Sequence, residues 1–207
     1  MNPYIFQPEA IVLDAGDYPV HQIPKQLLKA VPKVICCDGA ALQFIQDGNV
    51  PWIIIGDGDS LTTTIKEEYS LVYRHIEEQD TNDQTKAIRY LHQHSINSIA
   101  ILGATGKRED HTLGNISLLV DYMKEGLDVR MYTDHGVFIP CNGITCWEIP
   151  VGTQVSIFSF GAKDLKGYGL QYPLSDFTNW WQGTLNEAIA ASITIQGEGY
   201  YLLFFKY

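Results

Sequence analysis

Short apolar runs alternate with longer amphipathic segments over residues 9–132, and this alternation constrains the fold more than any other feature of the chain. Six of the apolar runs have the length and composition of buried strands: 9–13, 34–37, 52–55, 72–76, 99–102 and 129–132. Five intervening segments have the spacing or end signals of helices: 24–30, 40–46, 60–69, 84–94 and 110–124. Strands joined by helical crossovers run parallel. We therefore predict an α/β fold whose N-terminal part is a doubly wound, mostly parallel, Rossmann-like sheet.

Local signals predict where some of these helices begin and which faces they bury. Ser60 and Asp83 each stand where an N-cap is expected, because their side-chain oxygens can accept from free backbone N–H groups. The last helix has an apolar stripe at steps of three and four residues, formed by Leu113, Ile116, Val120 and Met123.

After about residue 134 the pattern changes to strand-like segments separated by Gly, Pro and Asn. These segments are 137–139, 144–149, 154–160, 168–172, 190–196 and 200–205. No helix of normal length fits there, so we predict a C-terminal antiparallel β-sandwich or barrel. The expected domains are residues 1–134 and 135–207.

Charge and cysteine content exclude several classes of protein. The formal net charge of −10 disfavours nucleic acid and anionic membranes as partners, but it suits metal cations and cationic small molecules. No apolar stretch is long enough to span a membrane, and the N-terminus does not resemble a signal peptide. The four cysteines form no Cys-x-x-Cys unit, which is typical of reduced thiols. We expect a cytoplasmic protein.

A pair of carboxylates follows the third predicted strand, in the segment Gly56-Asp57-Gly58-Asp59-Ser60. If the backbone stays extended, Asp57 and Asp59 point to the same side and form an anionic site suited to Mg²⁺. Gly58 would then leave room for a close-lying phosphate. The alternative is an ordinary polar turn, since Gly, Asp and Ser all favour turns.

Other acidic residues follow neighbouring strands. Asp38 ends the second predicted strand, and Asp80 and Asp83 lie at or just before a helix. Asp83 could add a third carboxylate to the pair, and Lys86 could neutralise a phosphate; capping and a simple ion pair remain the alternatives. Ligands bind at the carboxyl ends of parallel strands. We therefore expect these residues to converge with the loop 103–110 at one edge of the sheet.

The loop 103–110 reads Gly-Ala-Thr-Gly-Lys-Arg-Glu-Asp and joins a strand to a helix. Its glycines allow backbone N–H groups to approach an anion, and Lys107 and Arg108 add positive charge. It matches neither a Walker A loop nor the dinucleotide-binding fingerprint. A phosphate-binding loop near three carboxylates suggests phosphoryl-group transfer from a nucleotide, although an ordinary glycine turn is the alternative.

Four spaced motifs resemble those of the thiamine pyrophosphokinase family and occur in that family's order. They are Asp38–Ala41, Gly56–Ser60, Gln79–Ala87 and Gly103–Asn115, with weaker similarity at Tyr172–Leu174 and Asn186–Glu187. The resemblance implies an α/β catalytic domain and a C-terminal β-sandwich that binds thiamine and forms a homodimer. It further implies Mg²⁺-dependent transfer of the pyrophosphoryl group of ATP to the hydroxyl of thiamine, with release of AMP.

The resemblance also implies roles for individual residues. Asp57, Asp59 and Asp83 would hold the metal and, with Arg108, carry catalysis. Nucleotide contacts would come from Asp38, Gln79, Asp80, Lys86, Thr105, Lys107, Asp110 and Asn115. Thiamine contacts, across the dimer interface, would come from Trp181, Thr184 and Asn186.

Three residues depart from the family's usual pattern. Gly58 replaces a bulky aromatic residue, Asn82 replaces threonine, and Leu185 replaces the serine before Asn186. Two alternatives therefore stay open: a metal-dependent nucleotide transferase or hydrolase with another small acceptor, and a non-catalytic sensor of thiamine or nucleotide.

Overall fold

The computed structural model describes residues 1–207, which form two compact units. The α/β unit comprises residues 8–118 and 126–134. The β unit comprises residues 1–7, 119–125 and 135–207. The N-terminal segment and the end of the last helix thus belong to the β unit, which no local sequence signal had indicated.

The α/β unit is built on a parallel sheet in the order β4-β3-β2-β1-β5-β6. Its strands are β1 (Ala10–Leu13), β2 (Val34–Cys37), β3 (Ile53–Gly56), β4 (Tyr73–His75), β5 (Ser98–Leu102) and β6 (Asp128–Tyr132). Every residue of β1, β2 and β3 is buried, as expected for strands covered on both faces. The predicted parallel sheet is confirmed.

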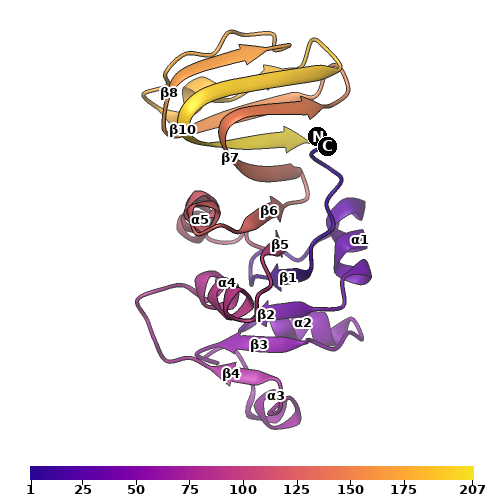
Figure 1. The fold of residues 1–207 in the computed structure, drawn as a ribbon. Helices are drawn as coiled ribbons and strands as arrows, with labels where there is room; N and C mark the ends of the chain where they lie inside the picture. The colour runs from indigo at the N-terminus through magenta and orange to yellow at the C-terminus, as the bar shows by residue number, and fades with distance from the viewer. The chain divides into compact units, whose positions relative to one another are not determined.

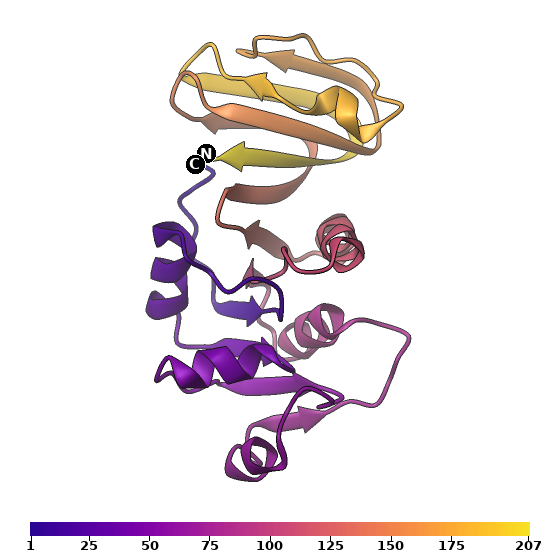
Figure 2. The same cartoon turned by 180° about the vertical axis from the view of Figure 1, so that it is seen from behind.

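Helices cover both faces of this sheet. They are α1 (Gln22–Ala30), α2 (Ala40–Gln46), α3 (Thr63–Glu68), α4 (Asp83–Gln93) and α5 (Glu109–Lys124). Figures 1 and 2 show α1 and α2 on one face, with α4 and the first part of α5 on the other. The chain winds from β1 outward to β4 and then restarts beside β1 with β5, so the carboxyl ends of β1 and β5 flank a topological switch point. None of the helices combines the length and the apolar character that crossing a bilayer requires.

Both predicted N-caps are wrong by one or two residues. Thr62 caps α3, because its hydroxyl accepts from the Ile65 N–H at 3.3 Å. Asn82 caps α4, because its side-chain oxygen accepts from the Thr85 N–H at 3.0 Å. The carboxylate of Asp83, the first residue of α4, is therefore not used as a cap.

The predicted apolar stripe of α5 is only partly buried. Val120 is fully buried, but Leu113 is 56% exposed. The fully covered residues of this helix, Leu119, Val120 and Tyr122, lie in its last turns. Periodicity shows which side chains share a face, but it does not show how far a neighbouring layer extends beneath them.

The β unit contains an antiparallel sheet in the order β7-β10-β8-β9. Its elements are β7 (Gly136–Glu148), β8 (Gln154–Tyr168), the 3₁₀ helix η1 (Trp180–Gly183), β9 (Asn186–Glu187) and β10 (Ser192–Lys206). The long strands curve, so that their halves lie in different layers (Figures 1 and 2). Trp147 and Phe205 pack in the core with their ring centroids 5.2 Å apart. The predicted antiparallel C-terminal fold is confirmed.

The predicted strand boundaries in this unit are wrong in several places. Segments 137–139 and 144–149 join into β7, and segments 190–196 and 200–205 join into β10. Gly143 and Gly199 have positive φ angles of 65° and 92°, and the pairing of β10 shifts register between Gln196 and Tyr200. These glycines therefore lie at irregular positions inside continuous strands, where the sequence pattern predicted turns. The segment 168–172 contributes only the last residue of β8 and one bridge at Leu170.

Candidate active site

The carboxyl ends of the parallel strands surround a cavity of about 680 Å³ that lies within the α/β unit. The cavity brings together eight of the side chains singled out from the sequence: Asp57, Gln79, Asp83, Lys86, Lys107, Arg108, Asp110 and Asn115. These residues follow β3, β4 and β5 or lie in the first half of α4 and α5. They converge because every strand of a parallel sheet ends at the same edge.

Four other predicted residues do not line the cavity. Asp38 is 6% exposed and accepts from the Ser60 N–H at 3.0 Å. Asp59 and Asp80 are exposed at the surface. Thr105 contributes its carbonyl oxygen, which accepts from the Asp17 N–H at 2.8 Å. The structure thus separates Asp59 from the cavity that its neighbour Asp57 lines.

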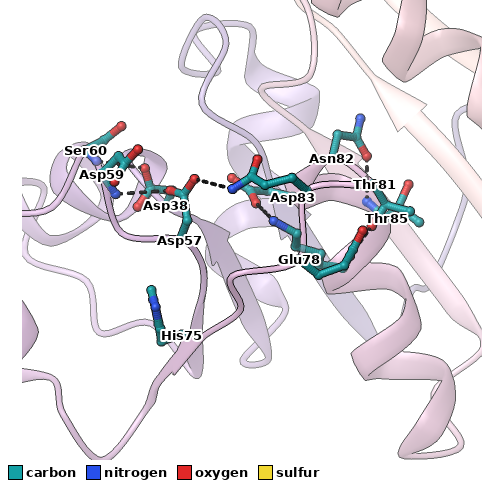
Figure 3. Close-up of polar contacts among 12 residues, drawn as sticks. Asp38, Asp57, Asp59, Ser60, His75, Glu78, Thr81, Asn82, Asp83 and Thr85 are labelled. Atoms are coloured by element: carbon teal, nitrogen blue, oxygen red, sulfur yellow. Dashed lines mark hydrogen bonds and ion pairs between the residues drawn. The ribbon is translucent and has the colours of Figure 1, made fainter.

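The segment after β3 is a turn, which is the alternative that the sequence left open beside an extended backbone. Gly56 and Gly58 have φ angles of 151° and 78°, which only glycine adopts readily. The Asp59 N–H donates to Asp57 Oδ1 at 3.1 Å, and Gln79 Nε2 donates to Asp57 Oδ2 at 3.2 Å. Figure 3 shows Asp57, Asp59 and Ser60 gathered around Asp38. The backbone hydrogen bond from Asp59 and the side-chain bond from Gln79 lower the pKa of Asp57.

The space beside Gly58 is filled, so the prediction that it admits a phosphate is wrong at this position. A Cβ atom on Gly58 would overlap the hydroxyl oxygen of Tyr73 and lie 2.9 Å from Lys66 Cε. Both side chains come from elements next to the turn, β4 and α3. Glycine is favoured here because its φ of 78° lies in the left-handed region, and the ends of these two side chains fill the space beside it.

Asp83 and Lys86 form a partly buried ion pair at the start of α4. Lys86 Nζ lies 3.0 Å from Asp83 Oδ1, and the lysine side chain is 4% exposed. Burial raises the pKa of Asp83, the charges of Asp38 and Asp57 add to this effect, and Lys86 partly offsets it. The rise shows that the burial of Asp83 outweighs the stabilisation that Lys86 gives to its charged form.

Asp14, at the end of β1, is a cavity residue to which the sequence reasoning gave no role. It is 7% exposed, and its Oδ2 atom has no hydrogen-bond partner. Burial raises the pKa of Asp14 to about 7, with a smaller contribution from the charge of Asp83 and an opposing one from a hydrogen bond with Cys37. The sequence did contain a signal for Asp14. Like Asp38, it comes directly after an apolar run that predicts a buried strand, and Asp57 comes one residue after such a run.

The two basic residues of the loop 103–110 are already engaged. Lys107 Nζ donates to the Ala15 carbonyl at 2.7 Å and joins this loop to the loop after β1. Arg108 grips Asp110 through two bonds, Nε to Oδ1 at 3.1 Å and Nη2 to Oδ2 at 2.6 Å. The pair is exposed, and the bond from Arg108 lowers the pKa of Asp110 to about 2.

Close backbone contacts fix this loop beside β1. The Gly16 N–H donates to the Gly103 carbonyl at 2.7 Å, and a Cβ on Gly16 would overlap that oxygen. Asn115 Nδ2 donates to the Ala104 carbonyl at 2.9 Å, while its Oδ1 accepts from Asn82 at 2.8 Å. Asn115 therefore links the loop to Asn82, the N-cap of α4.

The predicted thiamine residues belong to the β unit. Asn186 is 5% exposed, and its amide makes two bonds with the backbone of Tyr172, at 3.1 and 2.9 Å. The Thr184 hydroxyl donates to the Trp181 carbonyl at 2.7 Å, and Trp181 is 70% exposed. Leu185 is 75% exposed and has a φ of 62°, which is unusual for a leucine. The assignment of these residues to thiamine stays a prediction.

The acidic side chains suit a cation that prefers oxygen ligands, although they do not enclose such a cation by themselves. No group of three or more His, Cys, Asp or Glu side chains is placed to hold a metal ion. Magnesium, however, is usually bound by one or two carboxylates together with substrate phosphates. Asp14 Oδ2 and Asp38 Oδ1 are buried without partners, and the charges around Asp83 repel one another. The residues present therefore fit a divalent cation.

The fold and the cavity together define an α/β protein with an acidic, oxygen-rich site of the kind used in phosphoryl-group transfer. Two family models match the chain in succession. The model of the catalytic domain of thiamin pyrophosphokinase matches residues 24–131. The model of the substrate-binding domain of thiamin pyrophosphokinase matches residues 136–204.

Individual relatives agree with these matches. Thiamine pyrophosphokinase of Bacillus subtilis (strain 168) is 30% identical over 147 residues, which span 67% of this chain and 69% of that protein. A solved structure of the Bacillus subtilis enzyme has a TM-score of 0.78 at 22% identity, covering 95% of this chain and 98% of that chain. Thiamin pyrophosphokinase from Candida albicans has a TM-score of 0.81 at 16% identity, covering 100% and 92%. At these identities the two structures establish the fold.

The chain belongs to the thiamin pyrophosphokinase family. It is therefore an enzyme of that family, and membership supports the pyrophosphorylation of thiamine as its activity. The family resemblance predicted from the four motifs is confirmed.

Proposed function

We propose that this enzyme transfers the β,γ-pyrophosphoryl group of ATP to the hydroxyl of thiamine, with Mg²⁺, and releases thiamine diphosphate and AMP. One observation carries the proposal: a single cavity combines the buried carboxyl group of Asp14, the partly exposed carboxylates of Asp57 and Asp83, the buried Lys86 and the guanidinium of Arg108. A polyphosphate bound beside carboxylates requires a cation between them, and this is the arrangement that phosphoryl transfer uses.

In this proposal Asp57, Asp59 and Asp83 hold the metal. A divalent cation bound there would neutralise the polyphosphate and polarise the phosphorus that is attacked. Gln79 orients the carboxylate of Asp57 through the 3.2 Å bond described above. Lys86 holds the carboxylate of Asp83 at 3.0 Å, so both acids keep a fixed direction.

The nucleotide would lie along the opposite wall of the cavity. Arg108 presents to phosphate the same two-donor fork that Asp110 now occupies, so a phosphate oxygen can replace the Asp110 carboxylate. Of the other assigned contacts, Lys107 and Asn115 line the cavity and keep their proposed place at the nucleotide, whereas Asp38, Asp80 and Thr105 lie outside its lining and stay predictions of the family resemblance. Because the Lys107 and Asn115 side chains hold the loop, we propose that they act mainly by fixing its shape.

Thiamine is proposed to bind through residues 135–207, with Trp181, Thr184 and Asn186 on its side of a homodimer interface and residues 1–134 supplying catalysis. The exposed indole of Trp181 suits a cationic aromatic ligand, because the face of the ring attracts positive charge. We also propose a cytoplasmic location, in keeping with four free thiols, three of them buried.

A turnover assay tests the proposal. Purified protein with ATP, Mg²⁺ and thiamine is expected to form AMP and thiamine diphosphate in equal amounts. Chromatography measures both products. Asp57→Asn should lower the rate at least about 10²-fold, because a neutral amide cannot hold the cation. Asp47→Asn, at the exposed end of α2, is the matched control and should keep the wild-type rate.

Two outcomes would contradict the proposal. AMP formation that does not depend on thiamine would favour a different acceptor or hydrolysis, and an acceptor screen in the same assay would identify it. No AMP above the Asp57→Asn background would exclude the reaction altogether.

A further inference from the structure

Asp14 lines the cavity, but the proposed reaction gives it no part. It directly follows β1, at the switch point where β1 and β5 are neighbours. The residue is 7% exposed, its Oδ2 atom has no hydrogen-bond partner, and its carboxyl group takes part in no ion pair. A buried polar group without a partner costs free energy, and a ligand that supplies the partner recovers that free energy on binding.

The neighbouring strand β2 provides one hydrogen bond to this carboxyl group. Asp14 and Cys37 follow residues that are paired in the β1–β2 register, and their side chains are hydrogen-bonded. Burial, and next the charge of Asp14, raise the pKa of the Cys37 thiol. The thiol therefore keeps its proton and is the donor in this bond, with the carboxyl group as acceptor. A proton on the carboxyl group itself is not used by Cys37.

Asp14 does hold such a proton, because burial raises the pKa of its carboxyl group to about 7. The titratable and charged groups around it are Cys37 on β2, Asp83 on α4 and Lys107 in the loop after β5. Lys107 does not pair with the carboxyl group, since its Nζ donates to the Ala15 carbonyl at 2.7 Å. Below about pH 7 the group is consequently a neutral acid, which can donate a hydrogen bond.

Hydrogen bonds tie the segment 14–17 to the loop 103–110. The Asp14 N–H donates at 2.8 Å to the carbonyl that precedes this loop. Two further backbone bonds, of 2.7 and 2.8 Å, and the bond from Lys107 join the two segments. The carboxyl group of Asp14 is therefore fixed beside the loop that is proposed to bind phosphate.

We propose that Asp14 is a substrate-binding residue: its carboxyl group, held by the Cys37 thiol beside the loop 103–110, donates a hydrogen bond to a phosphate oxygen of ATP. The inference rests on the proposed function, in which this loop binds the polyphosphate. A phosphate oxygen is an acceptor, so it satisfies the unused donor without bringing two negative charges together. The divalent cation stays assigned to the other carboxylates.

Two substitutions separate the donor from the charge. Asp14→Ala removes the donor, so the affinity for α,β-methylene-ATP with Mg²⁺ at pH 6 should fall about 10- to 100-fold. Asp14→Asn keeps a neutral donor in its amide and should recover most of that loss. If Asp14 instead held the cation, Asp14→Asn would bind as poorly as Asp14→Ala, because an amide does not replace the charge. Asp47→Ala, at the exposed end of α2, is the matched control and should bind as the wild type does.

Isothermal titration calorimetry without thiamine measures these affinities, and at pH 8 it also counts protons. Two buffers of different ionisation enthalpy give the number of protons that move on binding. At pH 8 most of the free wild-type protein has lost the Asp14 proton. The bond to phosphate requires that proton again, so the wild type should take up more protons than Asp14→Asn, by up to about one per site. Coordination of the cation by Asp14 would cause no such uptake.

Two further ligands test whether the bond is made to the phosphates. Inorganic triphosphate with Mg²⁺ carries phosphates without a nucleoside, and Asp14→Ala should weaken its binding by a similar factor. Adenosine carries the nucleoside alone, and its binding should be the same in Asp14→Ala and wild type. The reverse pattern would assign the bond to the ribose or the base and would overturn the proposal.

The outcomes separate the inference from the proposed function. Weaker binding by Asp14→Ala, recovery in Asp14→Asn and extra proton uptake by the wild type support the role of Asp14. Equal binding by wild type and a folded Asp14→Ala, no recovery in Asp14→Asn, or equal proton uptake overturns that role and leaves the proposed function standing. If the wild type binds neither the analogue nor triphosphate, the proposed function fails, and the inference with it. Circular dichroism and the melting temperature show whether each variant is folded.

Discussion

The two walls of the cavity differ in how their charges are satisfied. The acidic wall, formed by Asp14, Asp57 and Asp83, keeps one buried carboxyl oxygen, Asp14 Oδ2, without a partner and contains a single ion pair, between Asp83 and Lys86. On the basic wall, the loop 103–110, Lys107 and Arg108 each have a partner already. The ligand-free protein thus has unmet negative charge on one side of the cavity and satisfied positive charge on the other.

This difference indicates how the two walls would work. Unpaired buried charge is costly, so the acidic wall gains stability from any cation that binds there. The basic wall gains only when a phosphate replaces a partner, and the exposed Arg108–Asp110 pair is easily exchanged. Substitutions in the acidic wall should therefore change both activity and stability, whereas substitutions of Arg108 should change activity alone.

The largest effect is expected for Asp83→Asn. Activity should fall at least about 10²-fold because a proposed metal ligand is lost. The free energy of unfolding should also fall by about 2 kcal/mol, because the buried ammonium of Lys86 loses its carboxylate. Steady-state rates and urea denaturation measure the two effects, with Asp47→Asn as control. Wild-type activity in a folded Asp83→Asn protein would remove Asp83 from the site.

Arg108→Gln is expected to lower activity by roughly 10- to 100-fold, because a neutral amide cannot offer phosphate a charged fork. Its melting temperature should stay at the wild-type value, since the pair with Asp110 is exposed. Asp110→Asn frees Arg108 and should reduce activity less than Arg108→Gln does. A clear drop in melting temperature for Arg108→Gln would contradict the contrast between the walls.

The effect expected to leave activity least changed is a change in how stability depends on pH, and it comes from Asp14. The folded protein holds this proton up to about pH 7, whereas the unfolded chain releases it near 3.8. Between these values the folded state binds more protons, so the free energy of unfolding falls as pH rises. In Asp14→Asn, the difference in the free energy of unfolding between pH 5 and pH 8 should be smaller than in the wild type by a few kcal/mol. Urea denaturation at the two pH values measures it. Identical pH slopes would contradict the assigned burial of the carboxyl.

The comparison of the two units shows why prediction from sequence succeeded unevenly. In the α/β unit, apolar runs end where the strands end, because Asp or Gly follows each of β1, β2, β3 and β5 directly or within a residue. In the β unit, Gly143 and Gly199 look the same in sequence but lie inside long strands. Glycine has no side chain and allows the backbone to turn or only to bend. Which of the two occurs depends on whether a neighbouring strand pairs with the backbone on both sides of it.

By itself, the sequence determined the parallel sheet and the set of acidic and basic residues at its carboxyl edge, because strand alternation and strand ends are local properties. It also determined the family through four ordered motifs. Only the tertiary structure decided that Asp57 lines the cavity whereas Asp59 does not, and that Lys107 and Arg108 are engaged. It also decided that Tyr73 and Lys66 fill the space at Gly58. These outcomes depend on contacts between side chains from separate helices, strands and loops. A local sequence pattern does not show which of these side chains will occupy a shared space.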